Sequence, residues 1–437
     1  MSQSPVTFFW FRRDLRLFDN AGLHAALQGD HPVVPLFIFD RNILEDLHDK
    51  QDARVEFIHQ TLQDMQKQLN SWNSSLLVRH GKPKEVWQHL LDEFNIQAVY
   101  TNNDYEPYAK TRDGQIADLL QHHDVEFRTF KDQVIFEKDE VLKNDGDPYT
   151  VYTPYKNKWK TEFAQTHSLD TMFDVSAHKK KFWDNQSQQL PELQDFGFQA
   201  TDATFPAQQL DENIVTQYDK QRDFPAIRGT TRMGVHLRFG TVSIRELVRR
   251  AMHLNETWLD ELIWREFYMM ILHQFPHVVE HAFREKYDTI EWANNKENFD
   301  RWCAGETGYP LVDAGMRELN ETGFMHNRVR MVTASFLSKH LLIDWRWGER
   351  YFAEKLLDYE LASNNGNWQW AAGTGCDAAP YFRIFNPTTQ MKKFDPDLKY
   401  IATWVPEYGT DKYPAPMVDH KFARQRALDV YGRAVKN

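Results

Sequence analysis

Two indoles, a carboxylate and a guanidinium lie close together in the segment Trp258-Leu-Asp-Glu-Leu-Ile-Trp-Arg265. On a helix, Trp258, Glu261 and Trp264 follow one another at three-residue steps and share one broad face, which extends to the neighbouring Arg265. This mixture is unusual for a plain hydrophobic core. It predicts either a salt-bridged structural face or one wall of a pocket for a flat ligand.

A second candidate is Gly229-Thr-Thr-Arg-Met-Gly234, a turn with two hydroxyls that precedes the apolar run Val235–Phe239. Glycine lets backbone N–H groups come close to a ligand, and the N-terminus of a helix favours anions. The turn therefore suits a pyrophosphate. Turns of glycine and threonine are also common without any ligand, and that reading stays open.

Two later segments are rich in polar side chains. In His326-Asn-Arg-Val-Arg-Met331, Asn327 and Met331 are four residues apart and so lie on the same side of a helix, although a solvated face would also explain the charges. The segment from Asp358 to Gln390 opens with dense Asn, Gly and Trp, without the periodicity of a core helix. Eight of the fourteen tryptophans lie between residues 251 and 370, which suits a core, a stacking platform or an electron path.

The elements that position these residues fall into two classes. Short apolar runs at 6–11, 33–39, 76–78 and 98–100 predict strands, and the segments between them, at 53–69, 84–94 and 111–120, have helical periodicity. This alternation predicts a parallel, Rossmann-like α/β sheet covered by helices, although the G-x-G-x-x-G fingerprint is missing.

From about residue 206 onward, the pattern predicts helices only, at 243–251, 257–275, 313–319, 329–342 and 350–361. Residues from about 165 to 205 have little periodicity and are interpreted as a surface connector. We therefore expect an α/β domain over 1–131, an inter-domain connector over 132–205 and an all-helical domain over 206–437.

Composition narrows the class of protein. The chain has 437 residues and a net charge of −11, with 41% hydrophobic and 26% charged residues, which is typical of a globular protein and argues against a purely electrostatic nucleic-acid binder. The two cysteines cannot form a disulfide framework, and we expect no metal site. No apolar stretch is long enough to span a membrane and the first residues lack a secretory signal, so we expect a cytoplasmic protein, most simply a monomer.

The segment that follows Asp358 resembles the flavin-and-substrate signature of the photolyase/cryptochrome family. The resemblance begins at Phe8-Phe-Trp-Phe-Arg-Arg-Asp-Leu-Arg16 and covers the whole chain apart from the connector. Asn327-Arg-Val-Arg-Met331 and Trp368-Gln-Trp370 are most similar to the class I photolyases, which repair cyclobutane pyrimidine dimers. The family implies an enzyme, a carbon–carbon lyase, with an α/β antenna domain followed by a helical domain that binds FAD and DNA.

The resemblance also implies roles for single residues. It implies an Arg330–Asp358 pair and places Asn364 at the N5 atom of the flavin, where an amide stabilises the reduced cofactor. A chain of three tryptophans, Trp368, Trp345 and Trp292, would carry electrons from the surface, with Trp292 outermost. The implied FAD-binding residues are Tyr218, Thr230, Thr231, Arg232, Met233, Gly234, Trp258, Arg265, Asn327, Arg330, Asp358, Tyr359 and Glu360.

The substrate implied by the resemblance is UV-damaged DNA with the dimer flipped out of the duplex. Trp264 and Trp370 would form aromatic walls, Glu261 and Asn327 would hydrogen-bond the base edges, and Met331 would fill the remaining gap. The implied contacts to the DNA backbone and the pocket rim are Arg222, Arg328, Arg383 and Gln390.

Three departures from the family pattern are visible. Gly234 stands where the phosphate loop usually has Ser, and Glu360 replaces the second Asp of an Asp-x-Asp motif. The folate-antenna branch has an Asn-Glu pair where this chain has Tyr108-Ala109. A folate antenna is therefore not expected, whereas a deazaflavin, a flavin nucleotide or no antenna all stay open.

Two other functions stay open as well. A cryptochrome would use the same FAD for blue-light signalling, and a (6-4) photolyase would repair a different lesion. The absence of a long polar tail before Asn437 and the paired tryptophan walls favour dimer repair. A nicotinamide-dependent oxidoreductase has no supporting fingerprint.

Overall fold

The computed structural model describes residues 4–166, 172–185 and 189–436. The chain divides into two compact units, each made of several stretches of sequence. Unit 1 comprises residues 1–137, 166–209 and 233–250, and unit 2 comprises residues 138–165, 210–232 and 251–437. The domains expected from the sequence are continuous ranges of the chain, whereas each unit combines several ranges. The expected boundaries therefore stay predictions.

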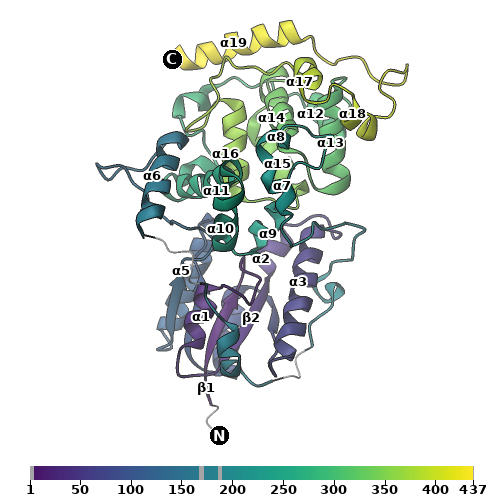
Figure 1. Cartoon of the computed structure of the whole chain (residues 1–437). Helices are drawn as coiled ribbons and strands as arrows, with labels where there is room; N and C mark the ends of the chain where they lie inside the picture. The colour runs from purple at the N-terminus through teal and green to yellow at the C-terminus, as the bar shows by residue number, and fades with distance from the viewer. Residues whose placement is uncertain (1–3, 167–171, 186–188, 437) are drawn as a thin grey trace. The chain divides into compact units, whose positions relative to one another are not determined.

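Unit 1 contains a five-stranded parallel sheet with the order β3-β2-β1-β4-β5. The strands are β1 (Pro5–Phe11), β2 (Val33–Asp40), β3 (Leu77–Gly81), β4 (Asn95–Asn102) and β5 (Glu126–Phe130). The helices between them are α1 (Ala21–Leu27), α2 (Arg41–Glu45), α3 (Ala53–Asn70), α4 (Pro83–Glu93) and α5 (Pro107–Gln121). This confirms the predicted α/β class, and Figure 1 shows the alternation of strands and helices along the chain.

The central strands are buried on both faces, as expected for parallel strands. Phe8 and Trp10 of β1 pack with Trp87 of α4, whereas Phe9 points the other way, where a Cβ on Gly22 of α1 would lie 2.9 Å from its ring. The edge strand β5 was missed by the sequence analysis. Its side chains are all exposed or only half-buried, so it has no apolar run to signal it.

Residues 172–185 and 189–205 also belong to unit 1, and they do more than run over its surface. Phe182, Phe196 and Phe198 are buried, and the ring of Phe196 stacks on Phe39 with 4.0 Å between ring centroids. The expectation of a surface connector was thus wrong for these side chains, because aromatic residues without periodicity still pack against the sheet.

Unit 2 is helical, as predicted, and its described residues form no sheet, only an isolated bridge between Leu142 and Pro148. Its helices are α6 (Tyr152–Thr166), α7 (Glu212–Thr216), α8 (Tyr218–Gln221), α11 (Glu256–Gln274), α12 (Lys296–Ala304), α13 (Pro310–Thr322), α14 (Asn327–Ser335), α15 (Trp345–Lys355), α16 (Leu361–Ala372), α17 (Pro387–Phe394), α18 (Lys399–Trp404) and α19 (His420–Lys436). Two further helices follow α8 along the chain. The first, α9 (Gly234–Phe239), belongs to unit 1, and the second, α10 (Ile244–Leu254), begins in unit 1 and ends in unit 2.

Two predicted helices of unit 2 differ in the structure. The helix expected over 329–342 is α14 followed by a π-helical turn at Phe336–His340. The bounds of the helix expected over 350–361 were wrong, because α15 begins at Trp345 and ends at Lys355. Its start is set by Asp344, whose side chain accepts a hydrogen bond from the backbone N–H of Arg346. The segment after Asp358 contains a regular helix, α16, which the sequence analysis did not recognise.

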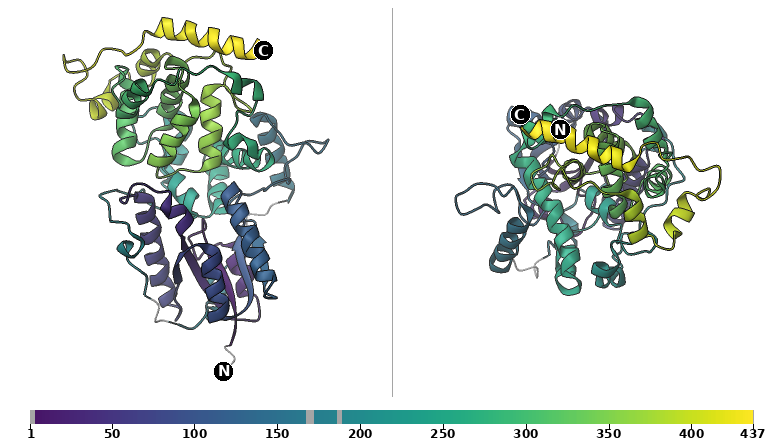
Figure 2. Two further views of the ribbon diagram at one scale, coloured as in Figure 1. Left: turned by 180° about the vertical axis from the view of Figure 1, so that it is seen from behind. Right: turned by 90° about the horizontal axis from the view of Figure 1, so that it is seen from above.

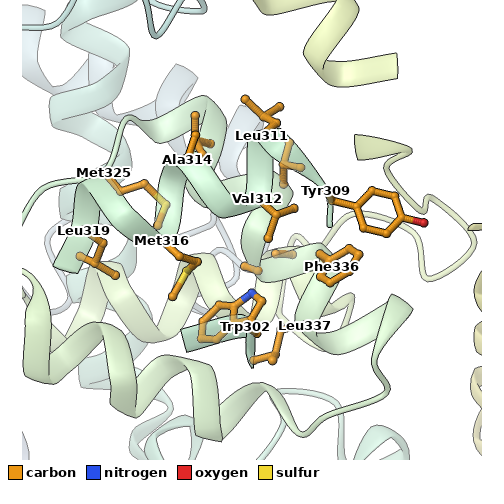
Figure 3. Close-up of a cluster of buried hydrophobic side chains, with 14 of the residues drawn as sticks. Trp302, Tyr309, Leu311, Val312, Ala314, Met316, Leu319, Met325, Phe336 and Leu337 are labelled. Carbon is orange, nitrogen blue, oxygen red and sulfur yellow. The ribbon is translucent and has the colours of Figure 1, made fainter. Parts of the chain in front are cut away.

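A large apolar core holds α12, α13, α14, α15 and α16 together. Figure 3 shows part of it, including Trp302 of α12 and Leu311, Val312 and Met316 of α13. Trp302 lies at its centre with no exposed surface, and its indole N–H donates to the carbonyl oxygen of Thr333 across 3.3 Å. Figure 2 shows α19 at one end of this unit, seen from behind and from above. The helices that carry the candidate site are thus fixed by a common core.

Candidate functional site

One cavity in unit 2 gathers many of the predicted site residues. It lies among α14, α15, α16 and the segment between the last two, and its unfilled space of about 570 Å³ includes open solvent. The predicted residues in its lining are Asn327, Arg330, Met331, Asp358, Tyr359, Glu360, Asn364, Trp368 and Trp370. The sequence analysis missed the other lining residues, Ala334, Phe352, Leu356, Ser363, Asn367 and Ala371.

A signal for some of the missed residues was present in the sequence. Four lining residues lie on one side of α16 and its N-cap, spaced by three, one and three positions: Glu360, which is the N-cap, and Ser363, Asn364 and Asn367. Asn and Gly are poor helix formers, so composition concealed this periodicity.

Ion pairs fix the acidic side of the cavity. Nη2 of Arg330 donates to both carboxylate oxygens of Asp358, across 3.1 and 3.0 Å, while its Nε donates to the carbonyl oxygen of Met325. Nη2 of Arg265 donates to Oε1 of Glu360 across 2.9 Å. The predicted Arg330–Asp358 pair is present in the structure, and both carboxylates have a cationic partner.

Asn364 is oriented by a residue that the sequence analysis did not consider. Its Nδ2 donates to the backbone oxygen of Glu349, across 3.1 Å, and to Oε1 of the same residue, across 2.8 Å. Burial raises the pKa of Glu349. Because Nδ2 donates in this way, Oδ1 is the atom of Asn364 that remains to accept a hydrogen bond from a ligand in the cavity.

The three tryptophans expected to conduct electrons differ in exposure. Trp368 in the cavity wall and Trp345 on α15 are buried, at 2% and 1% exposure, whereas Trp292 is half-buried. Gly348, one turn after Trp345, lies against the Trp368 ring, which brings the two helices close at this point. The N–H of Ala293, next to Trp292, donates to the carbonyl oxygen of Leu342 across 2.7 Å.

Other predicted residues are not part of the cavity lining. Arg222 forms an ion pair with Glu261, and burial raises the pKa of Glu261. The indole of Trp264 stacks face to face on Tyr152, with ring centroids 3.5 Å apart and planes within 9°. The structure therefore places Glu261 and Trp264 on α11 rather than in the cavity lining formed by Trp370 and its neighbours.

The residues expected at the DNA rim are dispersed. Nη2 of Arg328 donates to Asp223 across 2.7 Å, and its guanidinium lies 4.3 Å from the ring centroid of Phe394. Arg383 is exposed, and Gln390 lies half-buried on α17. Of these three, Arg383 is the most available to a phosphate group.

The predicted phosphate loop begins in unit 2 at Thr230, Thr231 and Arg232. Arg232 has φ of +54°, and its half-exposed guanidinium lies 4.1 Å from the ring centroid of Phe324 and 4.0 Å from Oε1 of Glu318. Tyr218, at the start of α8, is half-buried and Trp258, in the first turn of α11, is buried. The last two residues of the loop, Met233 and Gly234, belong to unit 1, where α9 begins at Gly234.

These features fit FAD. The isoalloxazine ring needs aromatic and amide neighbours, and the cavity supplies Trp368 and Asn364. The pyrophosphate needs cations and hydroxyls, and the half-exposed Arg232, with Thr230 and Thr231 beside it, supplies both. Among the described residues, no cluster of three or more His, Cys, Asp or Glu side chains has metal-binding geometry.

In unit 1, the strand order reverses between β1 and β4, which is where ligands bind in sheets of this type. The guanidinium groups of Arg12 and Arg112 lie over the indole of Trp10, at 5.2 and 5.0 Å from its centroid. Tyr108 donates its hydroxyl to Asp40 across 2.6 Å. The position where the folate branch has Asn-Glu thus holds a tyrosine bonded within the chain.

Comparisons with known proteins agree with this geometry. Residues 7–173 match a family model described as DNA photolyase, and residues 258–411 match one described as the FAD binding domain of DNA photolyase. A deoxyribodipyrimidine photo-lyase of a Synechococcus species is 36% identical over 98% of this chain and 97% of its own length.

Two solved structures are also similar. A bacterial class III photolyase from Agrobacterium tumefaciens has a TM-score of 0.86 and 31% identity and covers 100% of this chain and 99% of its own. An archaeal photolyase from Sulfolobus tokodaii, described with two FAD molecules and a novel light-harvesting cofactor, has a TM-score of 0.81 and 32% identity, with 98% and 99% of the two chains covered. None of the described helices is both long and apolar enough to cross a bilayer.

Proposed function

The chain belongs to the DNA photolyase family, and on this premise we propose that it repairs cyclobutane pyrimidine dimers in DNA, with light as the energy source and FAD as the cofactor. The observation that carries the choice of reaction is the cavity in which Asn364, Trp368 and Trp370 meet. When bound and reduced, FAD supplies a photoexcited electron donor.

We assign the flavin end of the cavity to Asn364, Arg330 and Asp358. The Asn364 Oδ1 atom is held in one direction by the two hydrogen bonds from Nδ2 to Glu349. The Arg330–Asp358 pair presents a fixed charge distribution to the cofactor, since both groups are already bonded before a ligand binds.

We assign the dimer end to Trp370, Met331 and Asn327, which line the same cavity, and to Trp264 and Glu261 on the neighbouring α11. The indoles offer flat surfaces for the two bases, and stacking of this kind is worth about 1–3 kcal/mol per base. Burial raises the pKa of Glu261 and its carboxyl is paired with Arg222, so the group is held in place to hydrogen-bond a base edge.

The proposed DNA contacts are local, so a net charge of −11 does not oppose them. Arg383 is exposed and can bind a phosphate directly. Arg222 and Arg328 are already paired with Glu261 and Asp223, so phosphate binding there competes with an existing ion pair. We also propose that the chain acts as a monomer, which light scattering on the purified protein would check.

The decisive experiment is repair of a DNA duplex that contains one cyclobutane dimer, measured in light and in the dark. Trp370→Ala should weaken binding of this duplex about 5- to 150-fold while retaining FAD, because one stacking wall is lost. Binding of the matched undamaged duplex should hardly change. Repair of (6-4) products instead of dimers, or light-driven flavin reduction without any repair, would contradict the proposal.

The cofactor is tested separately. Denaturing the purified protein and separating the released flavin by chromatography should give FAD, one per chain, and no flavin mononucleotide from this site. A colourless protein that does not take up added FAD would contradict the assignment. A second chromophore in unit 1 would appear in the same chromatogram, and we expect it not to be a folate.

A further inference from the structure

We propose that Tyr152 is a positioning residue for substrate recognition, which holds the indole of Trp264 in the orientation that receives one base of the dimer. The inference rests on the proposed function, because it assigns a support to one of the proposed walls. The observation that carries it is the stack of the two rings, with centroids 3.5 Å apart and planes within 9°.

Tyr152 is itself held at three points. Its ring packs on Trp264, its hydroxyl donates to the backbone oxygen of Asp260 across 2.7 Å, and its backbone N–H donates to Oδ2 of Asp377 across 3.0 Å. It is only 6% exposed, whereas Trp264 is half-buried. A buried and anchored ring thus supports a ring that is partly open to solvent.

The helix that carries Tyr152 is fixed to α11 along its length. Lys156 and Lys160 of α6 both form ion pairs with Asp260, and the indole N–H of Trp159 donates to Glu266 across 2.5 Å. The α6 helix therefore braces the stretch of α11 that bears Trp264, and Tyr152 contacts the indole itself.

Support of this kind matters because the proposed wall acts by stacking, which depends on the angle between rings. A half-exposed tryptophan without a neighbour samples several rotamers, and fixing it on binding reduces affinity. Trp264 also packs on Phe267 and Tyr268 of its own helix, with ring centroids 5.7 and 5.5 Å away. The parallel ring of Tyr152, which comes from α6, adds the face-to-face contact that fixes the plane of the indole before the dimer arrives. Burial raises the pKa of Tyr152, so the phenol stays neutral and the support does not change across the physiological pH range.

The groups around Tyr152 allow a matched set of variants. Tyr152→Leu removes the stack, and Tyr152→Phe keeps the ring but loses the hydroxyl bond to Asp260. Tyr155 lies on the same helix and packs against Phe267, with ring centroids 5.2 Å apart. Tyr155→Leu therefore disturbs the contact between α6 and α11 and keeps the face-to-face stack of Tyr152 on Trp264, while it also loosens Phe267, whose ring meets Trp264 edge-on.

The measurement is the Kd of the FAD-loaded full chain for a duplex with one cyclobutane dimer and for the matched undamaged duplex. Tyr152→Leu should weaken dimer binding about 2- to 12-fold, the range expected for loss of one aromatic pair, and leave binding of undamaged DNA unchanged. Tyr152→Phe and Tyr155→Leu should bind the dimer like the wild type. At saturating protein, repair per absorbed photon should be unchanged in Tyr152→Leu, because the residue acts on binding.

A double-mutant cycle tests whether the effect passes through Trp264. In a Trp264→Ala background, Tyr152→Leu should have no further effect. An equal loss of dimer binding in Tyr155→Leu would overturn the inference, because it would indicate general damage to α6. An additive loss in the double variant would overturn it as well. So would tighter dimer binding by Tyr152→Leu, because Tyr152 would then occupy the face of Trp264 that the base needs. If Trp264→Ala itself binds the dimer like the wild type, this proposed wall is wrong and the role of Tyr152 is refuted with it, whereas the Trp370 experiment still tests the proposed function.

Discussion

Gly348 lies so close to the indole of Trp368 that a Cβ atom at this position would come within 2.2 Å of the ring. The two residues belong to neighbouring helices, α15 and α16, whose close approach forms one wall of the cavity that we assign to the flavin. A methyl group of Leu337 also lies 2.5 Å from the same Cβ position. Glycine is therefore required at this position by the lack of space for a side chain, and not by its backbone conformation, which is helical.

From this relationship we predict that Gly348→Ala lowers the free energy of unfolding by about 1–3 kcal/mol, the usual effect of overpacking. We also expect the variant to slow light-driven reduction of the bound flavin by an external reductant. Thermal unfolding and flavin absorbance under illumination measure the two effects. Gly432→Ala is the control, because nothing lies within 4 Å of its Cβ and α19 should gain helix propensity. Equal stability of both variants would refute the prediction.

The electron path gives a second prediction. Trp368→Phe and Trp292→Phe should both strongly slow light-driven reduction of the flavin, because each removes one of three steps between cavity and surface. Repair by protein that was reduced beforehand should survive Trp292→Phe, since the half-buried Trp292 is far along the path and does not line the cavity. Both activities are measured in the same preparation. Normal photoreduction in Trp368→Phe would remove this path but leave the repair proposal intact.

The Arg330–Asp358 pair gives a third prediction. Arg330→Met should lower FAD affinity about 10- to 150-fold, because Asp358 then keeps an uncompensated charge in the cavity. Asp358→Asn should have a smaller effect, since the amide still accepts a bond from the guanidinium. Fluorescence of released flavin during dilution measures the affinity. Retention of FAD by Arg330→Met at the wild-type level would contradict the assigned role.

The buried Lys339 gives a pH-dependent prediction. Burial lowers the pKa of this side chain from 10.5 to about 7, while its Nζ donates to the backbone oxygen of Arg383 across 2.9 Å. Between these two pH values the unfolded chain binds the proton and the folded chain does not, so the free energy of unfolding rises as pH rises from about 7 toward 10.5.

Lys339→Met should remove this slope and raise Tm more at pH 6 than at pH 9. The gain at pH 6 is at most a few kcal/mol, since each tenfold change in proton affinity is worth about 1.4 kcal/mol. Thermal unfolding of wild type and variant over this pH range measures it. Parallel curves for the two proteins would show that Lys339 does not titrate in this way.

The sequence by itself determined the fold class of both parts of the chain and the residue types gathered at the candidate site. Apolar runs gave β1 and β2, because strands buried on both faces must be apolar throughout. Helical periodicity gave α3 and α11 to within one residue at each end. The residues after position 357 were singled out by their unusual composition and by the family resemblance, and several of them line the cavity.

Only the tertiary structure decided how these residues pair. Tyr152 and Trp264 are more than a hundred residues apart, and Arg265 and Glu360 are 95 apart, so no local pattern indicates that they meet. The sequence analysis also missed α16, because its Asn and Gly residues are poor helix formers, and β5, because its side chains are exposed or half-buried. Propensity and periodicity report local preferences, whereas α16 is held by packing and β5 by backbone pairing with β4. The residue types of the site are local information; its geometry is set by long-range contacts.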